Sequence, residues 1–494
     1  MHKKLAKWSS KWHRKLGWIS GLAVVIWAIS GLLHPIMTWT GPKAQKFFAP
    51  TFQLNQDSLQ QWQMNDLNAR LAEGEASVVK IVPTATVPQL QISNDAGERQ
   101  YLSLHTSQND DYNDEQHALW LGEHYTGLDA ETVETIQMVN QFSSEYPWVN
   151  RLLPVYRIHY QTPDNLVAFI HTETGALASL TNDNKSILQG VFRALHTWSW
   201  LDFSGSFRVW IIGFFMLVLL AQAVVGLSML YALAWRKIPD IKRRWHRIAG
   251  YVLWLPLLGW SLSGFYHLLK AEYVDSISGM RLTESIALQE LQFPQDNQWM
   301  SVLNGQAINA ITWVKRSDNT WMMRVGLAPP KSAKKVSREQ KYQGVVSEKN
   351  AWYFDSASSQ ILRLDDKTYA ESLALRFYGE NGTIKETQRV TRFGQGYDFR
   401  NKRLPVWKVE FDDAESTVFF IDPITGILVD SNRAVDRLES LSFSLLHKWS
   451  HLNAVMSRST RDNIMVATLV LSLLFSAIGM MMLIKRRRTH RVNF

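Results

Sequence analysis

Four long apolar stretches interrupt an otherwise polar chain. They cover about residues 16–39, 209–235, 248–269 and 464–484. Each is close to the ~20 residues that a helix needs to cross ~30 Å of hydrocarbon. The pattern therefore predicts an α-helical membrane protein with four transmembrane helices and two long polar segments, one after the first helix and one after the third.

The two polar segments contain short apolar runs that are typical of strands. Residues 166–170 and 417–421 are such runs, and a Thr-Gly turn follows each of them. We therefore expect two α+β domains, over 41–206 and 271–462. A basic run at 392–403 either attracts an anionic substrate or is a solvated loop. The remaining segments are the N-terminus with the first helix (1–40), the second helix (207–235), a short loop (236–247), the third helix (248–270), and the fourth helix with its tail (463–494).

The distribution of charge predicts the orientation of these segments. Basic residues gather before the first helix, in the short loop and in the tail, and the positive-inside rule places such regions in the cytoplasm. The first apolar stretch is a retained helix and not a signal peptide, because it is too long and no small-residue cleavage pattern follows it. We expect a bacterial inner-membrane protein in contact with lipid, with cytoplasmic termini and large periplasmic domains. The net charge of +9 then reflects topology and not nucleic-acid binding.

The chain is a tandem duplication. Residues 12–34, WHRKLGWISGLAVVIWAISGLLH, match residues 245–267, WHRIAGYVLWLPLLGWSLSGFYH. Further along, VAFIHTETGAL at 167 matches VFFIDPITGIL at 418, and ALHTWS at 194 matches LLHKWS at 445. Each unit is a helix, an outer domain and a second helix, so both units enter the membrane in the same direction. Equivalent residues are then expected at equal depth.

Six of the 14 histidines occupy matched positions in the two repeats. One matched pair is predicted at the cytoplasmic face and four histidines at the outer face. Ionisable groups at membrane depth are functional by default, and imidazole is the usual ligand of b-type haem. The alternative is that these are interfacial histidines bonded to water or to carbonyls. The matched pairs are His13 with His246, His34 with His267, and His196 with His447.

These histidines predict two b-type haems, one near each face. A third haem follows if His34 and His267 are also ligands. Arg14 and Arg247, next to the cytoplasmic pair, either bind haem propionates or only mark topology. The chain contains no cysteine, which excludes thiolate metal sites, iron–sulfur clusters and covalently attached haem.

Several of these motifs resemble the PepSY-associated transmembrane family. They are the Trp-His-Arg-x-x-Gly openings, the segments LPVYRIHY…VAFIHTETGAL and LPVWKVEF…VFFIDPITGIL, and the Leu-His before the second and fourth helices. Similar members include di-haem inner-membrane reductases that act on periplasmic ferric siderophores. The resemblance implies PepSY-like outer domains and haem ligands at His13, His196, His246 and His447. His34 and His267 are additional to the plainer family pattern.

The expected function is transmembrane electron transfer to a periplasmic ferric chelate or ferric siderophore. No G-x-G-x-x-G fingerprint for a nicotinamide or flavin cofactor follows a strand, so the electron donor is expected to be a separate cytoplasmic reductase or a membrane quinol. The sequence identifies no catalytic residue. The alternatives are a PepSY-type binding or regulatory protein and a transporter.

Overall fold

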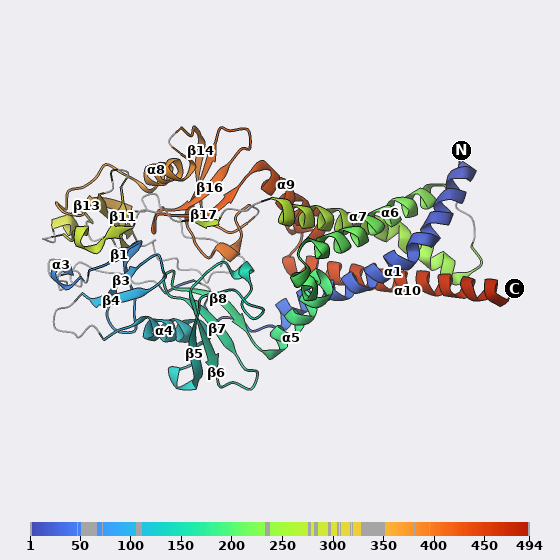
Figure 1. Ribbon diagram of the computed structural model, residues 1–494, viewed down its shortest axis with the longest axis horizontal. Coiled ribbons are helices and arrows are strands. Elements are labelled where there is room, and N and C mark those ends of the chain that lie inside the picture. Colours follow the sequence, from blue (N-terminus) through green and yellow to red (C-terminus); the bar gives the residue numbers. More distant parts are fainter. Residues whose placement is uncertain are drawn as a thin grey trace. The chain divides into compact units, whose positions relative to one another are not determined.

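The computed structural model divides into two compact units (Figure 1). The helical unit comprises Met1–Gly41, Asn184–Asp275 and Val435–Phe494, and the sheet unit comprises Pro42–Asp183 and Ser276–Ala434. The structure describes residues 2–46, 48–50, 67–71, 73–104, 111–232, 238–274, 278–280, 285–294, 298–303, 306, 308–316, 318, 320–327, 351–379, 381–394 and 396–492.

Four long helices form the helical unit and confirm the four predicted spans. They are α1 (His2–Thr40), α6 (Ser206–Ala232), α7 (Ile241–Tyr273) and α10 (Arg458–Val492). All four are long and apolar enough to cross a membrane. Large apolar side chains on them are exposed, for example Trp210 (69%) and Leu474 (57%), which is typical of a lipid-facing surface. The unit is therefore suited to a membrane.

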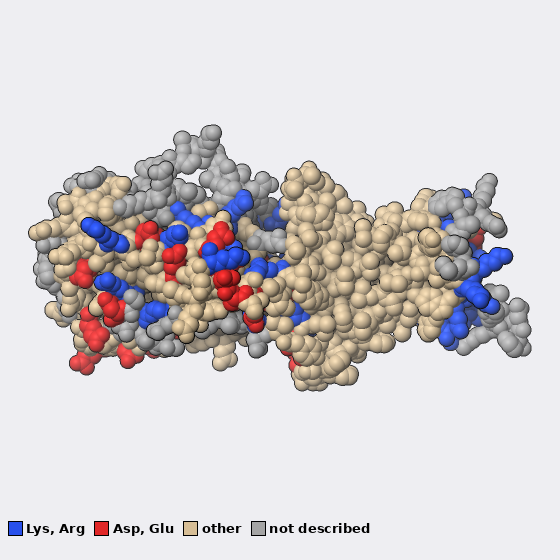
Figure 2. Space-filling model, turned by 90° about the horizontal axis from the view of Figure 1, so that it is seen from above, with Lys and Arg blue, Asp and Glu red and all other residues tan. Residues whose placement is uncertain are grey.

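Charged side chains are sparse along the middle of these helices. Figure 2 shows Lys and Arg side chains gathered at one end of the helical unit, beyond a long surface that is almost free of charge. Both chain termini lie at that end (Figure 1). This is the charge distribution on which the predicted orientation rests.

The packing of the four helices places α1 and α7 across the bundle from each other. Each of them packs between α6 and α10. Two short helices, α5 (Asp183–Phe192) and α9 (Ala434–Ser442), pass into π-helical turns at Arg193–Thr197 and Phe443–His447. The 3-10 turns Ser199–Ser204 and Ser450–Ala454 follow. Residues 184–206 and 435–462 therefore belong to the helical unit, although the sequence placed them in the outer domains. The sequence did not show this because these short polar helices lack the long apolar run of a transmembrane helix.

Each repeat contributes an antiparallel sheet with one helix to the sheet unit, in agreement with the predicted α+β class. The strand order is β5-β6-β7-β8 in the first repeat, and β14-β15-β16-β17-β9 in the second. The elements of the first are α4 (Asp114–Thr126), β5 (Val133–Val139), β6 (Val155–Tyr160), β7 (Val167–His171) and β8 (Ala176–Thr181). Those of the second are β9 (Ser278–Met280), α8 (Asp366–Tyr378), β14 (Ile384–Val390), β15 (Val406–Phe411), β16 (Val418–Asp422) and β17 (Ile427–Asn432).

A third sheet joins the two repeats, so the two predicted outer domains form one compact unit. Its order is β13-β12-β11-β2-β3-β4, and β2 pairs with β11 in antiparallel register, with Ile81 opposite Ile311. Its strands are β2 (Val78–Val82), β3 (Gln89–Ser93), β4 (Arg99–Ser103), β11 (Ile308–Lys315), β12 (Trp321–Leu327) and β13 (Ala351–Asp355). The short elements α3 (Leu67–Arg70), β1 (Glu75–Ala76) and β10 (Ile286–Ala287) complete the unit.

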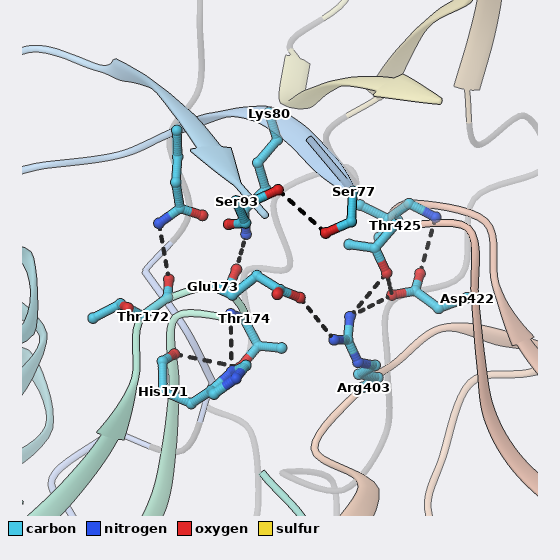
Figure 3. Close-up of polar contacts among 12 residues, drawn as sticks. Ser77, Lys80, Ser93, His171, Thr172, Glu173, Thr174, Arg403, Asp422 and Thr425 are labelled. Carbon is cyan, nitrogen blue, oxygen red and sulfur yellow. Dashed lines mark hydrogen bonds and ion pairs between the residues drawn. The ribbon is translucent and has the colours of Figure 1, made fainter. Parts of the chain in front are cut away.

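A buried ionic cluster also links the repeats within the sheet unit (Figure 3). Arg403 donates one hydrogen bond to Asp422 at 2.8 Å and another to Glu173 of the first repeat at 3.2 Å. These three charged side chains are at most 9% exposed. Arg403 also bonds Thr425, and Lys80 donates to the backbone oxygen of Glu173. Arg403 therefore belongs to an internal contact, although the sequence suggested a solvated loop or a substrate-attracting surface.

Candidate functional site

Four of the six matched histidines form two facing pairs in the helical unit. The ring centroids of His13 on α1 and His246 on α7 are 6.1 Å apart, with 66° between the ring planes. The centroids of His196 and His447, on the two π-helical turns, are 6.3 Å apart, with 89° between the planes. Each pair joins equivalent residues of the two repeats.

The His13–His246 pair lies where the packing of α6 and α10 leaves room for two rings. Gly226 on α6 and Gly479 on α10 face the two histidines. A Cβ atom at 479 would lie 3.0 Å from Cε1 of His246, whereas one at 226 would lie 3.9 Å from His13. A side chain at 479 would therefore require the His246 ring to shift.

The π-helical turns present His196 and His447 to each other. Such single wide turns are frequently found at functional sites. Two residues after these histidines lie Trp198 and Trp449, which have φ values of 52° and 51°. Trp198 stacks on Trp27 at 5.9 Å, and Trp449 stacks on Trp260 at 5.4 Å. The two turns thus have the same construction in both repeats.

In three of the four paired histidines, an oxygen atom lies within hydrogen-bonding distance of Nδ1. The Nδ1 atom of His246 is 3.2 Å from the backbone oxygen of Phe475. The Nδ1 atom of His196 is 2.9 Å from Oγ of Ser30, and that of His447 is 3.2 Å from Oγ of Ser263. A proton on Nδ1 satisfies each contact and leaves the lone pair on Nε2, as in most metal-binding histidines.

The fourth histidine contacts the side-chain amide of Gln222 on α6. The Nε2 atom of Gln222 lies 3.1 Å from Nδ1 of His13 and 3.3 Å from its backbone oxygen. Oε1 of Gln222 is buried without a hydrogen-bond partner among the described residues. Exchanging the oxygen and nitrogen of the amide would bring an acceptor to Nδ1–H, as at the other three histidines, and would remove the hydrogen bond to the backbone oxygen of His13.

Burial keeps the second pair neutral. Removal from water lowers the pKa of His196 to about 4, and burial with the neighbouring His196 lowers the pKa of His447 to about 3. Both imidazoles are therefore uncharged at neutral pH, which is the form that binds a metal.

The spacing of both pairs fits one iron atom between two imidazoles. Metal–imidazole bonds are about 2 Å long, and a ring centroid lies about 1 Å from its nitrogen, so two imidazoles that would hold one metal ion between them would have centroids about 6 Å apart. Among the residues that the structure describes, no three His, Cys, Asp or Glu side chains come together to hold a metal ion. A pair of histidines suits haem, because the macrocycle supplies the other four nitrogen ligands.

His34 and His267 are not brought together in the same way. His34 lies 6.2 Å from the ring of Phe192, which stacks on His196 at 4.6 Å. His267 lies 4.7 Å from Phe443, which stacks on His447 at 4.4 Å. The Nδ1 atom of His267 is also 2.6 Å from Oε1 of Glu439. The two histidines therefore flank the His196–His447 pair, each behind an aromatic ring.

The arginines beside the first pair contact residues of their own helices. Arg14 donates to Oγ of Ser10 at 2.7 Å. Arg247 donates to the hydroxyl of Tyr251 at 3.3 Å. These contacts leave the proposed role in binding propionates as a prediction.

Sequence comparison of the repeats found the histidines but not the residues that hold them. The motif Trp-x-x-Ser-Gly-x-x-His was visible as a repeat, yet nothing in it showed that Ser30 and Ser263 reach histidines of distant segments. Gln222 was visible as a polar residue inside a span. Gly479 gave no signal, because glycine is common where transmembrane helices meet.

No protein-family model matches this chain, and no curated protein matches it.

Proposed function

We propose that this chain is a bacterial inner-membrane protein that binds two b-type haems and moves electrons from the cytoplasm to a periplasmic acceptor. The observation that carries the proposal is the pair of facing histidines at each of two levels, with centroid separations of 6.1 and 6.3 Å. The oxygen contacts at Nδ1 of His196, His246 and His447 support it, because a proton on Nδ1 leaves the lone pair of Nε2 to bind a metal.

The two levels are far enough apart to serve the two faces of a membrane. Ser30 on α1 contacts His196, and Ser263 on α7 contacts His447. The same two helices carry His13 and His246, so the distance along each helix from the histidine to the serine measures the separation of the two histidine pairs. At ~1.5 Å per residue, the helix from His13 to Ser30 and that from His246 to Ser263 are each about 25 Å long, close to the ~30 Å of a hydrocarbon core. When bound, haem would supply an iron that alternates between Fe(III) and Fe(II).

A ferric chelate or ferric siderophore is the proposed acceptor. The support is the resemblance to PepSY-associated reductases, together with a large sheet unit outside the four spans. The proposed donor is a cytoplasmic reductase or a membrane quinol, which would meet the His13–His246 level. The basic end of the helical unit (Figure 2) would face the cytoplasm.

The test is whether the purified protein passes electrons to a ferric chelate. Protein reduced with dithionite in detergent should be reoxidised when ferric siderophore is added, and a ferrozine assay should detect Fe(II). His196→Ala should lose this reaction because one of the two histidines that would hold the second haem is missing. His159→Ala is the matched control, since this histidine pairs with Glu134 in the sheet unit. Unchanged reoxidation in His196→Ala would contradict the proposal.

A second experiment tests the direction of transfer. In inside-out vesicles with the donor on the cytoplasmic side, His13→Ala should block reduction of the acceptor while dithionite still reduces the remaining haem. A preparation without haem would instead favour the binding, regulatory or transport alternatives.

A further inference from the structure

We infer that Ser30 and Ser263 are positioning residues that fix the tautomer and ring orientation of His196 and His447, and that Trp27 and Trp260 hold the backbone of the same two histidines. This inference rests on the proposed function and assigns a role to the repeated Trp-x-x-Ser motif. The four residues contact His196 and His447 and would act through these histidines.

The direction of the hydrogen bonds follows from the other partners of the serines. Oγ of Ser30 donates to the backbone oxygen of Trp27 at 3.2 Å, and Oγ of Ser263 donates to that of Gly259 at 2.7 Å. A hydroxyl group has one hydrogen and two lone pairs. We assign the hydroxyl hydrogen to the carbonyl, so that the serine accepts at its other side from Nδ1–H of the histidine. This tautomer leaves the lone pair of Nε2 for iron.

The tryptophans of the motif hold the backbone at the same positions. Nε1 of Trp27 donates to the backbone oxygen of His196 at 3.1 Å, and Nε1 of Trp260 donates to that of His447 at 3.2 Å. Residues three apart lie on one face of a helix, so each Trp-x-x-Ser motif meets one histidine at two points. One contact fixes the π-helical turn and the other fixes the ring.

Serine inside a transmembrane helix often bonds only a carbonyl of its own helix. That role explains the bonds to Trp27 and Gly259. It does not explain why both serines also contact an imidazole of another element, at matched positions in both repeats. The neighbouring Ser261 bonds only its own helix, because its Oγ donates to the backbone oxygens of Leu257 and Leu258.

Loss of the serine hydroxyl should weaken one centre and spare the other. Second-sphere partners of metal-binding histidines typically contribute 10–100-fold to metal affinity. We therefore expect Ser30→Ala and Ser263→Ala to weaken haem binding at the His196–His447 pair by about this factor. The reduction potential of that haem should also rise, because a histidine without its Nδ1 hydrogen bond is a poorer electron donor to Fe(III). Ser30→Thr, which keeps the hydroxyl, should restore both properties.

The experiment compares Ser30→Ala, Ser263→Ala, Ser30→Thr and the control Ser261→Ala in the purified full-length chain. Haem content is counted by pyridine haemochrome, and each low-spin haem is followed by electron paramagnetic resonance and redox titration. The haem at His13–His246 serves as an internal standard, because its signal reports that the bundle is folded. The inference predicts a change in one haem signal in both alanine variants and none in Ser261→Ala.

Two results would overturn the inference. If the wild-type protein binds two haems and both alanine variants match Ser261→Ala in haem content, potential and spectrum, the serines do not position the ligands while the proposed function stands. If the wild-type protein binds no haem, the proposed function fails and the inference fails with it.

Discussion

Replacing Arg403 with alanine should destabilise the sheet unit strongly. Arg403 lies between Asp422 of its own repeat and Glu173 of the other, and their side chains are only 9%, 5% and 5% exposed. Removal of the guanidinium would leave two buried carboxylates without the ion pairs that they share with Arg403, and Lys80 would remain as a nearby positive charge. Breaking a buried ion pair in this way typically costs about 3–5 kcal/mol, because the remaining charges stay desolvated.

This cost corresponds to a large shift in thermal stability. The entropy of unfolding is about 2.1 cal/mol/K per residue, so 1 kcal/mol shifts the melting temperature of a unit of roughly 300 residues by about 1.6 °C. The Arg403→Ala variant should therefore melt roughly 5–8 °C below the wild type. Calorimetry and tryptophan fluorescence of the detergent-solubilised protein would follow the transition, since Trp299 and Trp313 are buried in the sheet unit.

Arg157→Ala is the matched control for Arg403→Ala. Arg157 pairs with Glu145 in the same unit at 2.9 Å, but these side chains are 23% and 42% exposed. Exposed pairs contribute about 0.2–1 kcal/mol, so this variant should melt close to the wild type. Equal melting temperatures of Arg403→Ala and Arg157→Ala would refute the reasoning that the buried cluster joins the two repeats.

Two further predictions follow from single positions. Gly479→Ala should lower the occupancy of the haem at His13–His246, because the new Cβ atom would lie 3.0 Å from His246, whereas Gly226→Ala should be tolerated with its contact at 3.9 Å; equal haem content in the two variants would contradict this. Burial lowers the pKa of Lys80 to about 8, below the usual ~10.4. Between these values the unfolded chain binds more protons, so this group makes stability rise with pH, and Lys80→Met should flatten the increase in melting temperature from pH 8 to 10. An unchanged slope in Lys80→Met would show that other groups cause it.

The helices and the candidate ligands could be predicted from the sequence because both are marked by local patterns. Apolar runs identify spans without knowledge of their neighbours, and the duplication singled out six histidines from 14. Which two of the four outer histidines face each other could be seen only in the structure. The ring of Phe192 stacks on His196 at 4.6 Å. His34 lies farther from the same ring, at 6.2 Å and tilted.

Contacts between the repeats could not be predicted, because they depend on how two similar halves meet. The pairing of β2 with β11 joins a strand that begins at Val78 to one that begins at Ile308. Arg403 takes the place of Leu152 in the first repeat and looked like a loop residue, until its partners Glu173 and Asp422 were located. Residues that differ between the two repeats, such as Arg403, can therefore form the contacts that join them, and a comparison of the repeats alone does not show these contacts.

The haem content of the purified wild-type protein tests the central proposal most directly. Protein from haem-replete cells should contain two b-type haems per chain by pyridine haemochrome, with the sharp α and β bands of low-spin, bis-histidine iron after reduction by dithionite. Loss of one haem in His246→Ala and of the other in His447→Ala would assign them to the two pairs. A colourless protein, or one whose haem content is unchanged in both variants, would contradict the account.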